Sequence, residues 1–157
     1  MGLNEILMSI AGSDKGTYIL LMKADVKMPV VIGKLGVLNI QHGYYAYVGS
    51  AFGSGGLKAR LGHHMKIASK PHWHIDYLRK EVNLIKIYFD QSGERLENCW
   101  AKSLEKIPEA EIPLIGFGAS DCDAKSHLFY FKGEPDFSVL LTETGVGLRK
   151  EPLSKSG

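Results

Sequence analysis

The chain has 157 residues, of which 45% are hydrophobic and 23% charged, a balance that suits one folded domain and excludes a disordered chain. Its formal net charge of +2 is too small to identify a nucleic-acid partner by itself. Two cysteines cannot form a disulfide framework, and no apolar run is long enough to cross a membrane, so we expect a cytoplasmic protein without a membrane partner.

The first predicted elements are strands. Gly16–Ala24 is rich in β-branched, aromatic and leucine side chains, which is typical of a buried strand. Residues 29–43 predict a strand or hairpin interrupted by glycines, and residues 44–51 predict a further strand. The period of two in this last strand places Tyr45 and Tyr47 on the same face.

Helical periodicity begins after the glycine cluster "GSGG". Leu57, Leu61 and Met65 recur at helical spacing and predict an apolar stripe on a helix over residues 57–68. The elements predicted after it are a helix within 72–82, a strand at 83–90, a helix at 95–107 that ends before Pro108, and a strand at 126–131.

This order of elements predicts an α+β domain, in which about three helices flank a small, mostly antiparallel sheet. One domain is expected from residue 16 to residue 148. Residues 1–15 are expected to form an N-terminal extension and the polar residues 149–157 a flexible tail.

The junction between the tyrosine-rich strand and the first helix suits an anion. Glycines let the backbone approach a ligand closely, and helix N-termini attract negative charge. Arg60, expected in the first helical turn, can make two parallel hydrogen bonds to a phosphate. A Walker sequence is absent, so ATP is not implied. A flexible connection followed by a solvated Arg60 is the alternative interpretation of the same spacing.

The tyrosines also allow two interpretations. A tyrosine stripe on a strand is most often half-buried core. A tyrosine at a strand end beside Arg60 would instead have a pKa lowered by the cation, and its phenolate could then accept a proton from an attacking water.

Histidines and cysteines raise two further possibilities. Four histidines close to Asp76 suggest zinc, but their spacing matches no standard zinc pattern: His63, His64, His72 and His74. His74 is expected instead to start a helix or contact a phosphate. A nucleophilic pairing of His127 with Cys122, with Cys99 nearby, is weaker than an interpretation as core or loop packing.

Several segments resemble the GIY-YIG nuclease superfamily: "GTY" at residues 16–18, "YVG" at 47–49, the helix "GLKARLGHH" and a later helix that carries a glutamate. The longer strings "GYYAYVGSA", "HWHIDYL" and "GFGASDC…SHLFYF" resemble a small archaeal and bacterial branch of that superfamily. Members of this branch occur alone or fused to a base-excision DNA glycosylase. The resemblance runs from about residue 16 to residue 131.

The resemblance implies a metal-dependent endonuclease-like hydrolase that cleaves a nucleic-acid phosphodiester in DNA repair or processing, with a GIY-YIG core enlarged by extra strands. It implies one Mg²⁺ or Mn²⁺ ion, DNA as substrate in preference to RNA, and a DNA-repair enzyme as a further partner. By position, it implies catalytic roles for Tyr18, Tyr47, Arg60 and His64, with Glu97 as the metal ligand. The residues expected to contact nucleic acid are Gly49, Ser50, Lys58, Lys66 and His74.

Two departures from the branch and one rival function accompany this hypothesis. A long insertion separates Tyr18 from Tyr47, as in the branch but unlike most of the superfamily. Ala124 stands where the branch often has a second cysteine after Cys122, so a structural metal is not expected in that loop. The rival function is a non-catalytic nucleic-acid-binding module or an accessory partner of a DNA-repair enzyme. Which tyrosine acts as the base stays open.

Glu105 is a second candidate ligand on the helix that carries Glu97. Eight residues of helix separate the two carboxylates by about 12 Å along the axis, too far to share one ion. Glu97 is preferred because it matches the family position and lies near the helix N-terminus, where a carboxylate is favoured by the helix dipole.

Overall fold

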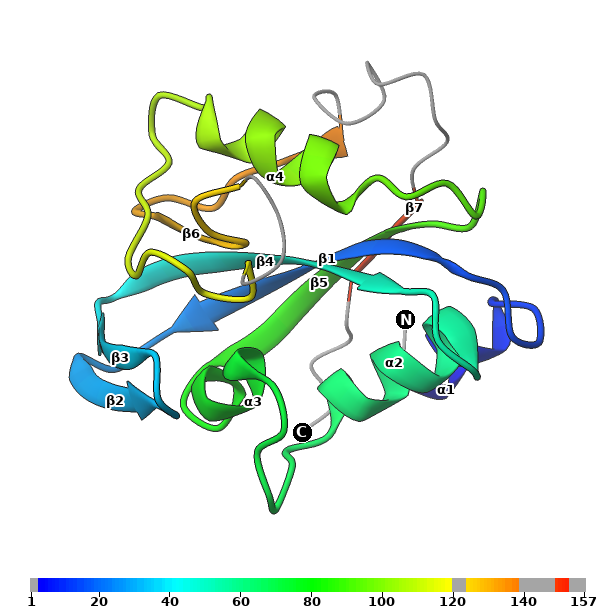
Figure 1. The fold of residues 1–157 in the computed structure, drawn as a ribbon, viewed down its shortest axis with the longest axis horizontal. Coiled ribbons are helices and arrows are strands. Elements are labelled where there is room, and N and C mark those ends of the chain that lie inside the picture. Colours follow the sequence, from blue (N-terminus) through cyan, green and yellow to red (C-terminus); the bar gives the residue numbers. More distant parts are fainter. Residues whose placement is uncertain (1–2, 120–123, 139–148, 153–157) are drawn as a thin grey trace.

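The computed structural model describes residues 3–119, 124–138 and 149–152 (Figure 1). The α+β class predicted from the sequence is confirmed. The helices are α1 (Leu3–Met8), α2 (Gly56–Met65), α3 (His74–Arg79) and α4 (Glu97–Glu105). The strands are β1 (Gly16–Ala24), β2 (Met28–Ile32), β3 (Gly36–Ile40), β4 (Gly43–Ala51), β5 (Asn83–Asp90), β6 (Leu128–Phe131) and β7 (Arg149–Pro152).

The main sheet has the strand order β6-β4-β1-β5-β7, and every neighbouring pair is antiparallel. The central strand β1 pairs with β4 on one side and β5 on the other, so that Tyr18 lies opposite Gly49 and Phe89. Helices cover both faces of β1, which explains why its sequence is an almost continuous apolar run rather than an alternating one.

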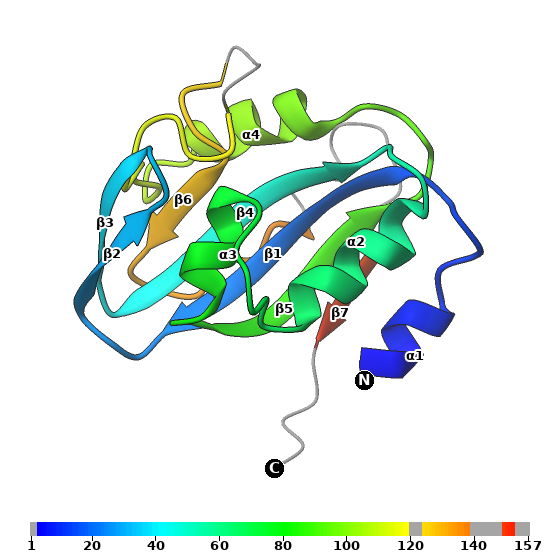
Figure 2. The same cartoon turned by 60° about the horizontal axis from the view of Figure 1, so that its bottom comes forward.

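Each face of the main sheet has its own core. Figure 2 shows α2 and α3 crossing one face, while α4 lies on the other. Tyr45 and Tyr47 point to the α2 and α3 face, as the period of two predicts. Val48 packs against Trp100 of α4 on the opposite face. Side chains on the two faces of β4 therefore pack against different helices. Residues from both helical layers can contact a functional group near the end of β4.

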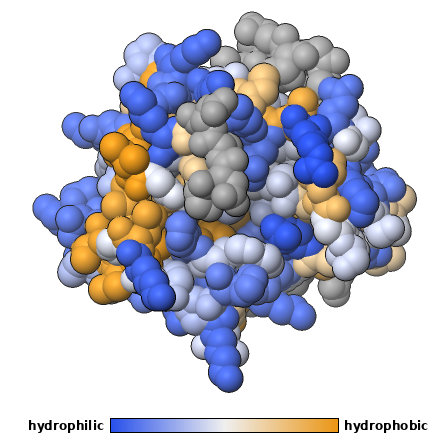
Figure 3. All heavy atoms as spheres, viewed as in Figure 1, coloured by the Kyte–Doolittle hydropathy of each residue, from blue (hydrophilic) through white to orange (hydrophobic). Residues whose placement is uncertain are grey.

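The insertion between the two motif tyrosines is the β2–β3 hairpin, which confirms the hairpin interpretation of residues 29–43. Its strands form a separate two-stranded sheet beside α3. Val31 and Val37 are cross-strand partners, with 63% and 50% of their surfaces exposed. Apolar side chains accordingly gather at this side of the molecule in Figure 3.

Gly16, the first residue of the "GTY" segment, is required by close packing. A Cβ atom at this position would lie 2.7 Å from Cδ1 of Leu57 and closer still to the carbonyl oxygen of Asp90. A larger residue would push β1 away from β5 and α2. The glycine therefore serves the fold.

The structure adds detail at both ends of the predicted domain. The N-terminal extension contains α1, and Ile6 and Ile10 at this end are buried. At the other end, Arg149–Pro152 form β7 and pair with β5, so the flexible tail predicted from residue 149 is wrong for these four residues. Long-range pairing of this kind leaves no local pattern in a polar segment. Within the described residues, no helix is long and apolar enough to span a membrane.

Candidate functional site

Four elements bring the predicted catalytic side chains to one end of the main sheet. Tyr18 comes from β1, Tyr47 from β4, Arg60 and His64 from α2, and Glu97 from the start of α4. The ring centroids of Tyr18 and Tyr47 are 6.5 Å apart, and that of His64 lies 5.3 Å from Tyr18 and 6.2 Å from Tyr47. Residues that are far apart in the sequence thus form one cluster.

Tyr18 and His64 form a buried hydrogen-bonded pair. The hydroxyl of Tyr18 lies 2.6 Å from Nε2 of His64, and both side chains are almost fully buried. Burial raises the pKa of Tyr18 well above its usual range and lowers the pKa of His64 to about 3. Both groups are therefore uncharged at neutral pH, and the hydrogen bond joins a phenol to a neutral imidazole.

The expectation that Arg60 lowers a tyrosine pKa needs correction. Arg60 does favour the phenolate of Tyr18, through its charge and a hydrogen bond, but burial and the neighbouring Tyr47 outweigh it. The pKa of Tyr47 is also raised, first by burial and then by the negative charge of Glu97, again against Arg60. Desolvation disfavours a buried anion more than one nearby cation favours it here. Both tyrosines are phenols in the chain as it stands.

Arg60 is held in place rather than freely solvated. Its Nη1 donates a 3.1 Å hydrogen bond to the carbonyl oxygen of Ser50, and its Cζ lies 4.2 Å from the ring centroid of Trp73. It is the fifth residue of α2, one residue further into the helix than predicted, because the helix already begins at Gly56. The stacked and hydrogen-bonded guanidinium argues against the interpretation as a loosely solvated side chain.

Glu97 reaches the same end of the sheet from the opposite face. It is the first residue of α4, and Ser50 of β4 makes a hydrogen bond with its carboxylate. Nδ1 of His127 lies 3.7 Å from Oε2 of Glu97. Glu105 lies at the far end of the helix, 3.9 Å from the Nζ atom of Lys125. The two glutamates of α4 therefore have separate surroundings, as the helix geometry predicts.

The pKa of Glu97 shows that its charge is incompletely compensated. Burial raises this pKa, and the hydrogen bond from Ser50 and the charges of Arg60 and Arg95 only partly oppose that effect. The Glu97 side chain is also about one third exposed. A divalent cation would stabilise its charged form and could keep water ligands on the exposed side, as Mg²⁺ does in proteins.

Gly49 provides the space in which the ring of Tyr18 lies. A Cβ atom at Gly49 would be 2.8 Å from Cε2 of Tyr18 and closer still to Cζ and the hydroxyl oxygen. The two residues are cross-strand partners in β1 and β4. The glycine of the "YVG" segment thus allows Tyr18 to extend across β4 toward His64.

A second polar cluster adjoins the first at the start of α3. Asp76 accepts hydrogen bonds from the backbone N–H groups of His72 and Trp73, at 2.8 and 3.0 Å, and from Nε2 of His63 at 2.9 Å. Burial raises the pKa of Asp76, but these hydrogen bonds outweigh it and the net shift is downward. The carboxylate therefore caps α3 in its ionised form.

Comparison with known proteins identifies a family whose model covers all the elements that form the site. The family model described as "Domain of unknown function DUF123" matches residues 17–147. The chain belongs to the DUF123 family. The DUF123 match spans β1, β4, α2 and α4, and therefore every member of the cluster from Tyr18 to Glu97. No curated protein and no solved structure matches the chain significantly.

The other residues of this DUF123 chain that were predicted to contact nucleic acid differ in their exposure to solvent. Lys58 and Lys66 are exposed on and just after α2, whereas Gly49 is buried and Ser50 is half-buried. His74 is the first residue of α3, and its Nδ1 accepts a 2.9 Å hydrogen bond from the N–H of Gly118. His74 therefore ties the 114–119 loop to α3, which leaves its other ring nitrogen for a ligand.

His127 has a different neighbour from the one suggested by the sequence. It was paired there with Cys122, which lies outside the described residues, while Cys99 is exposed on α4. His127 instead lies beside Glu97, and its carbonyl oxygen accepts a hydrogen bond from the N–H of Val48. Its position directly before β6 was the available signal, but only the pairing of β6 with β4 places it at the site.

Two small hollows flank Trp73 next to the cluster. One, of about 210 Å³, is lined by Arg60, His63 and the glycine-rich loop. The other, of about 190 Å³, is lined by Tyr47, His72 and Gly118 among others. Arg60 and Tyr47 can thus be reached from solvent on either side of one indole ring.

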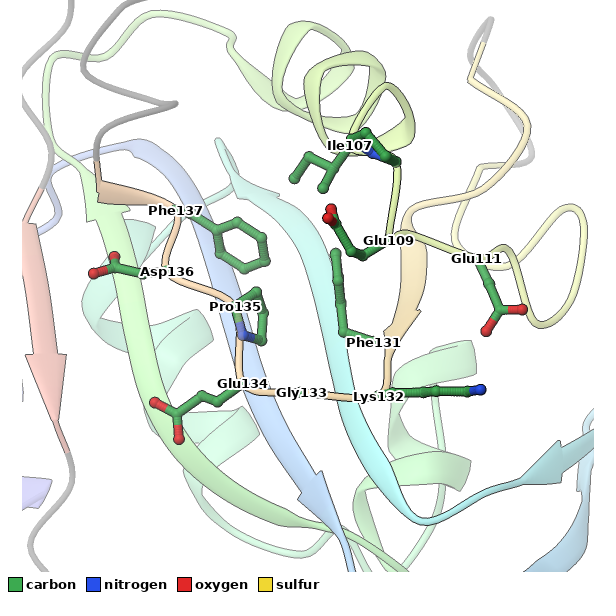
Figure 4. A pocket seen from close by; sticks show the side chains of 11 residues that line it. Ile107, Glu109, Glu111, Phe131, Lys132, Gly133, Glu134, Pro135, Asp136 and Phe137 are labelled. Carbon is green, nitrogen blue, oxygen red and sulfur yellow. The ribbon is translucent and has the colours of Figure 1, made fainter.

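A larger cavity of about 670 Å³ lies elsewhere, between the loop that follows α4 and residues 131–137. Figure 4 shows the rings of Phe131 and Phe137 facing it, with Ile107 above them. None of the predicted catalytic residues lines this cavity, so its size does not identify it with the candidate site.

Proposed function

We propose that the chain is a metal-dependent phosphodiester hydrolase of the GIY-YIG type, which cleaves nucleic acid in DNA repair or processing. The observation that carries the proposal is the convergence of two tyrosines, an arginine, a histidine and a glutamate from β1, β4, α2 and α4. Arg60 and Tyr47 also line hollows open to solvent. This set of side chains suits phosphoryl transfer, which needs a positioned cation and an activated oxygen nucleophile.

Glu97 is the residue that would hold one Mg²⁺ or Mn²⁺ ion. Its raised pKa and partial exposure support this assignment, because both indicate a carboxylate that a cation would stabilise. When bound, such an ion polarises the scissile phosphate as a Lewis acid. Ser50 and His127 adjoin the carboxylate and would orient it.

Arg60 would stabilise the negative charge that develops on the phosphate oxygens. Its Nη1 donates a hydrogen bond to the carbonyl oxygen of Ser50, and its Cζ lies over the ring of Trp73. These contacts fix the direction of the remaining N–H donors before the substrate binds. Preorganised donors of this kind need no rearrangement as charge develops.

The two tyrosines would have different roles. Tyr18 is fully buried and its hydroxyl is bonded to His64, so it would position its neighbours rather than meet the substrate. Tyr47 lines the hollow beside Trp73 and is the tyrosine that an incoming water can reach. Because the charge of Glu97 contributes to the raised pKa of Tyr47, neutralising that charge would lower this pKa and make the phenolate of Tyr47 easier to form.

The nucleic-acid strand would contact the exposed Lys58, near the start of α2, and the exposed Lys66, directly after its last residue. The backbone at Gly49 and Ser50 and the side chain of His74 would complete this surface. We propose DNA in preference to RNA as the substrate, a DNA-repair enzyme as a partner, and a cytoplasmic location. These parts of the proposal rest on the sequence resemblance.

The test is cleavage of supercoiled plasmid and end-labelled oligonucleotides with Mg²⁺, with Mn²⁺ and with EDTA. The parent chain should nick DNA only with a divalent ion. Glu97→Gln should lose at least about 100-fold in rate, since loss of one electrostatic group at a reacting centre typically costs about that much, while it retains DNA binding. Glu105→Gln is the matched control and should cleave like the parent. Activity in Glu97→Gln together with loss in Glu105→Gln would overturn the assignment.

A non-catalytic nucleic-acid-binding module is the second candidate function. The observation that favours it is the raised pKa of both Tyr18 and Tyr47, which leaves both as phenols in the metal-free chain. Such a module would bind DNA through Arg60, Lys58 and Lys66. The logarithm of its binding constant would fall linearly with the logarithm of the salt concentration. Salt-sensitive binding without nicking in any divalent ion would support this candidate instead.

A further inference from the structure

Three potential metal ligands lie together at the edge of the catalytic cluster: His63, Asp76 and His64, which is itself a member of that cluster. One ring nitrogen of each histidine and one carboxylate oxygen of Asp76 lie within 4.8 Å of one another. The histidines are consecutive at the end of α2, and Asp76 comes from α3. We propose that these residues form a binding site for one zinc ion, separate from the ion expected at Glu97.

One ring nitrogen of His64 is hydrogen-bonded, and the other has no partner among the described residues. Nε2 is bonded to the hydroxyl of Tyr18, whereas Nδ1 is buried and has no hydrogen-bond partner among the described residues. A buried polar nitrogen without a partner is costly, because it has lost its water without gaining a replacement. Coordination of a metal by Nδ1 would satisfy it.

Asp76 and His63 already have the spacing of neighbouring metal ligands. Nε2 of His63 lies 2.9 Å from Oδ1 of Asp76. Zinc bonds of about 2.0–2.1 Å place tetrahedral ligands about 3.3 Å apart, so a small separation of the two atoms would admit the ion. Oδ2 is held by the backbone N–H groups of His72 and Trp73, which leaves Oδ1 for the metal.

The surroundings of the three residues resemble the outer shell of a metal site. Metal-bound histidines usually bond through their second nitrogen to a neighbouring group, as His64 does with Tyr18. The hollow of about 210 Å³ lined by Arg60 and Trp73 also borders His63, whose side chain is 33% exposed. The proposed site can therefore be approached from solvent at His63, whereas His64 and Asp76 lie behind it and are buried.

The ligand set favours zinc over magnesium. Imidazole nitrogens suit zinc and related transition metals, whereas Mg²⁺ prefers oxygen ligands. Two histidines and one carboxylate leave a fourth position for water, as in zinc sites with three protein ligands. The sequence spacing matches no standard zinc pattern because His63 and His64 are consecutive on α2, whereas Asp76 comes from α3.

The experiment is a titration of the untagged, chelator-treated chain with Zn²⁺ by isothermal calorimetry, in the presence of excess Mg²⁺. The parent should bind one zinc ion per chain. His63→Ala should weaken binding at least about 100-fold, because even loss of an outer-shell partner typically costs about 10- to 100-fold. His72→Ala is the matched control: it removes an exposed imidazole beside the site but keeps the backbone N–H that bonds Asp76, and its affinity should stay within about twofold of the parent.

Asp76→Asn tests the third ligand and should weaken zinc binding as strongly, with circular dichroism to verify that α3 remains folded. If it unfolds, His63→Ala alone decides, since that side chain is partly exposed and leaves the cap of α3 in place. Equal zinc affinity in the parent and His63→Ala, or no binding at one ion per chain, would overturn the proposal. No nucleic acid enters the measurement, so its outcome is independent of the proposed nuclease activity.

Discussion

Replacement of Gly49 by alanine tests the packing of the two motif tyrosines most directly. The new Cβ would lie 2.8 Å from Cε2 of Tyr18 and closer still to its hydroxyl oxygen, whereas carbon atoms in contact are about 3.5–4.0 Å apart. The ring of Tyr18 must therefore shift by on the order of 1 Å. A shift of that size would stretch its 2.6 Å contact with Nε2 of His64 beyond ordinary hydrogen-bond length.

The expected cost follows from these two effects. Overpacking of a core costs about 1–3 kcal/mol, and loss of one hydrogen bond costs about 1 kcal/mol, so Gly49→Ala should lower the free energy of unfolding by about 2–4 kcal/mol. Urea denaturation followed by tryptophan fluorescence measures this change, because Trp100 is buried. Gly53→Ala is the matched control: a Cβ there meets no atom within 4 Å, so stability should change by less than about 0.5 kcal/mol. Equal stability of the two variants would refute the reasoning.

Three further predictions concern the same cluster. Arg60→Ala should abolish cleavage but keep a cooperative thermal transition, because the guanidinium lies in a hollow open to solvent; loss of soluble protein would instead make Arg60 a structural residue. Tyr18→Phe should lower the free energy of unfolding by about 1–3 kcal/mol in urea, because it leaves Nε2 of His64 buried without its hydroxyl partner, and an unchanged midpoint would argue against that hydrogen bond. Acidification should destabilise the fold through His64, whose pKa of about 3 lies below the unfolded value of 6.5. The unfolded chain takes up the proton first, so stability is full above about pH 6.5 and is lost as the pH falls toward 3, by about 2 kcal/mol at pH 5. His64→Gln should lack this part of the pH dependence, and parallel stability curves for parent and variant between pH 7 and 5 would contradict it.

The elements and the motif positions were determined by the sequence itself. Alternation in β4 and the 3.6-residue stripe on α2 are local patterns. They predicted which face of β4 carries Tyr47 and which face of α2 carries the buried Leu61. The exact bounds of β5 and the position of Glu97 at the start of α4 also followed from local signals. These features depend on neighbours within a few residues, which a sequence displays directly.

Only the tertiary structure decided the chemistry of the cluster. The sequence placed a cation near the tyrosines and predicted a lowered tyrosine pKa, but burial raises the pKa of Tyr18 because β1 lies between two helical layers. The contact of His127 with Glu97 likewise depends on the pairing of β6 with β4, and the pairing of β7 with β5 has no local signature. Desolvation and strand pairing arise from residues distant in the chain. A local pattern therefore cannot show the direction of a pKa shift or the partner of a strand.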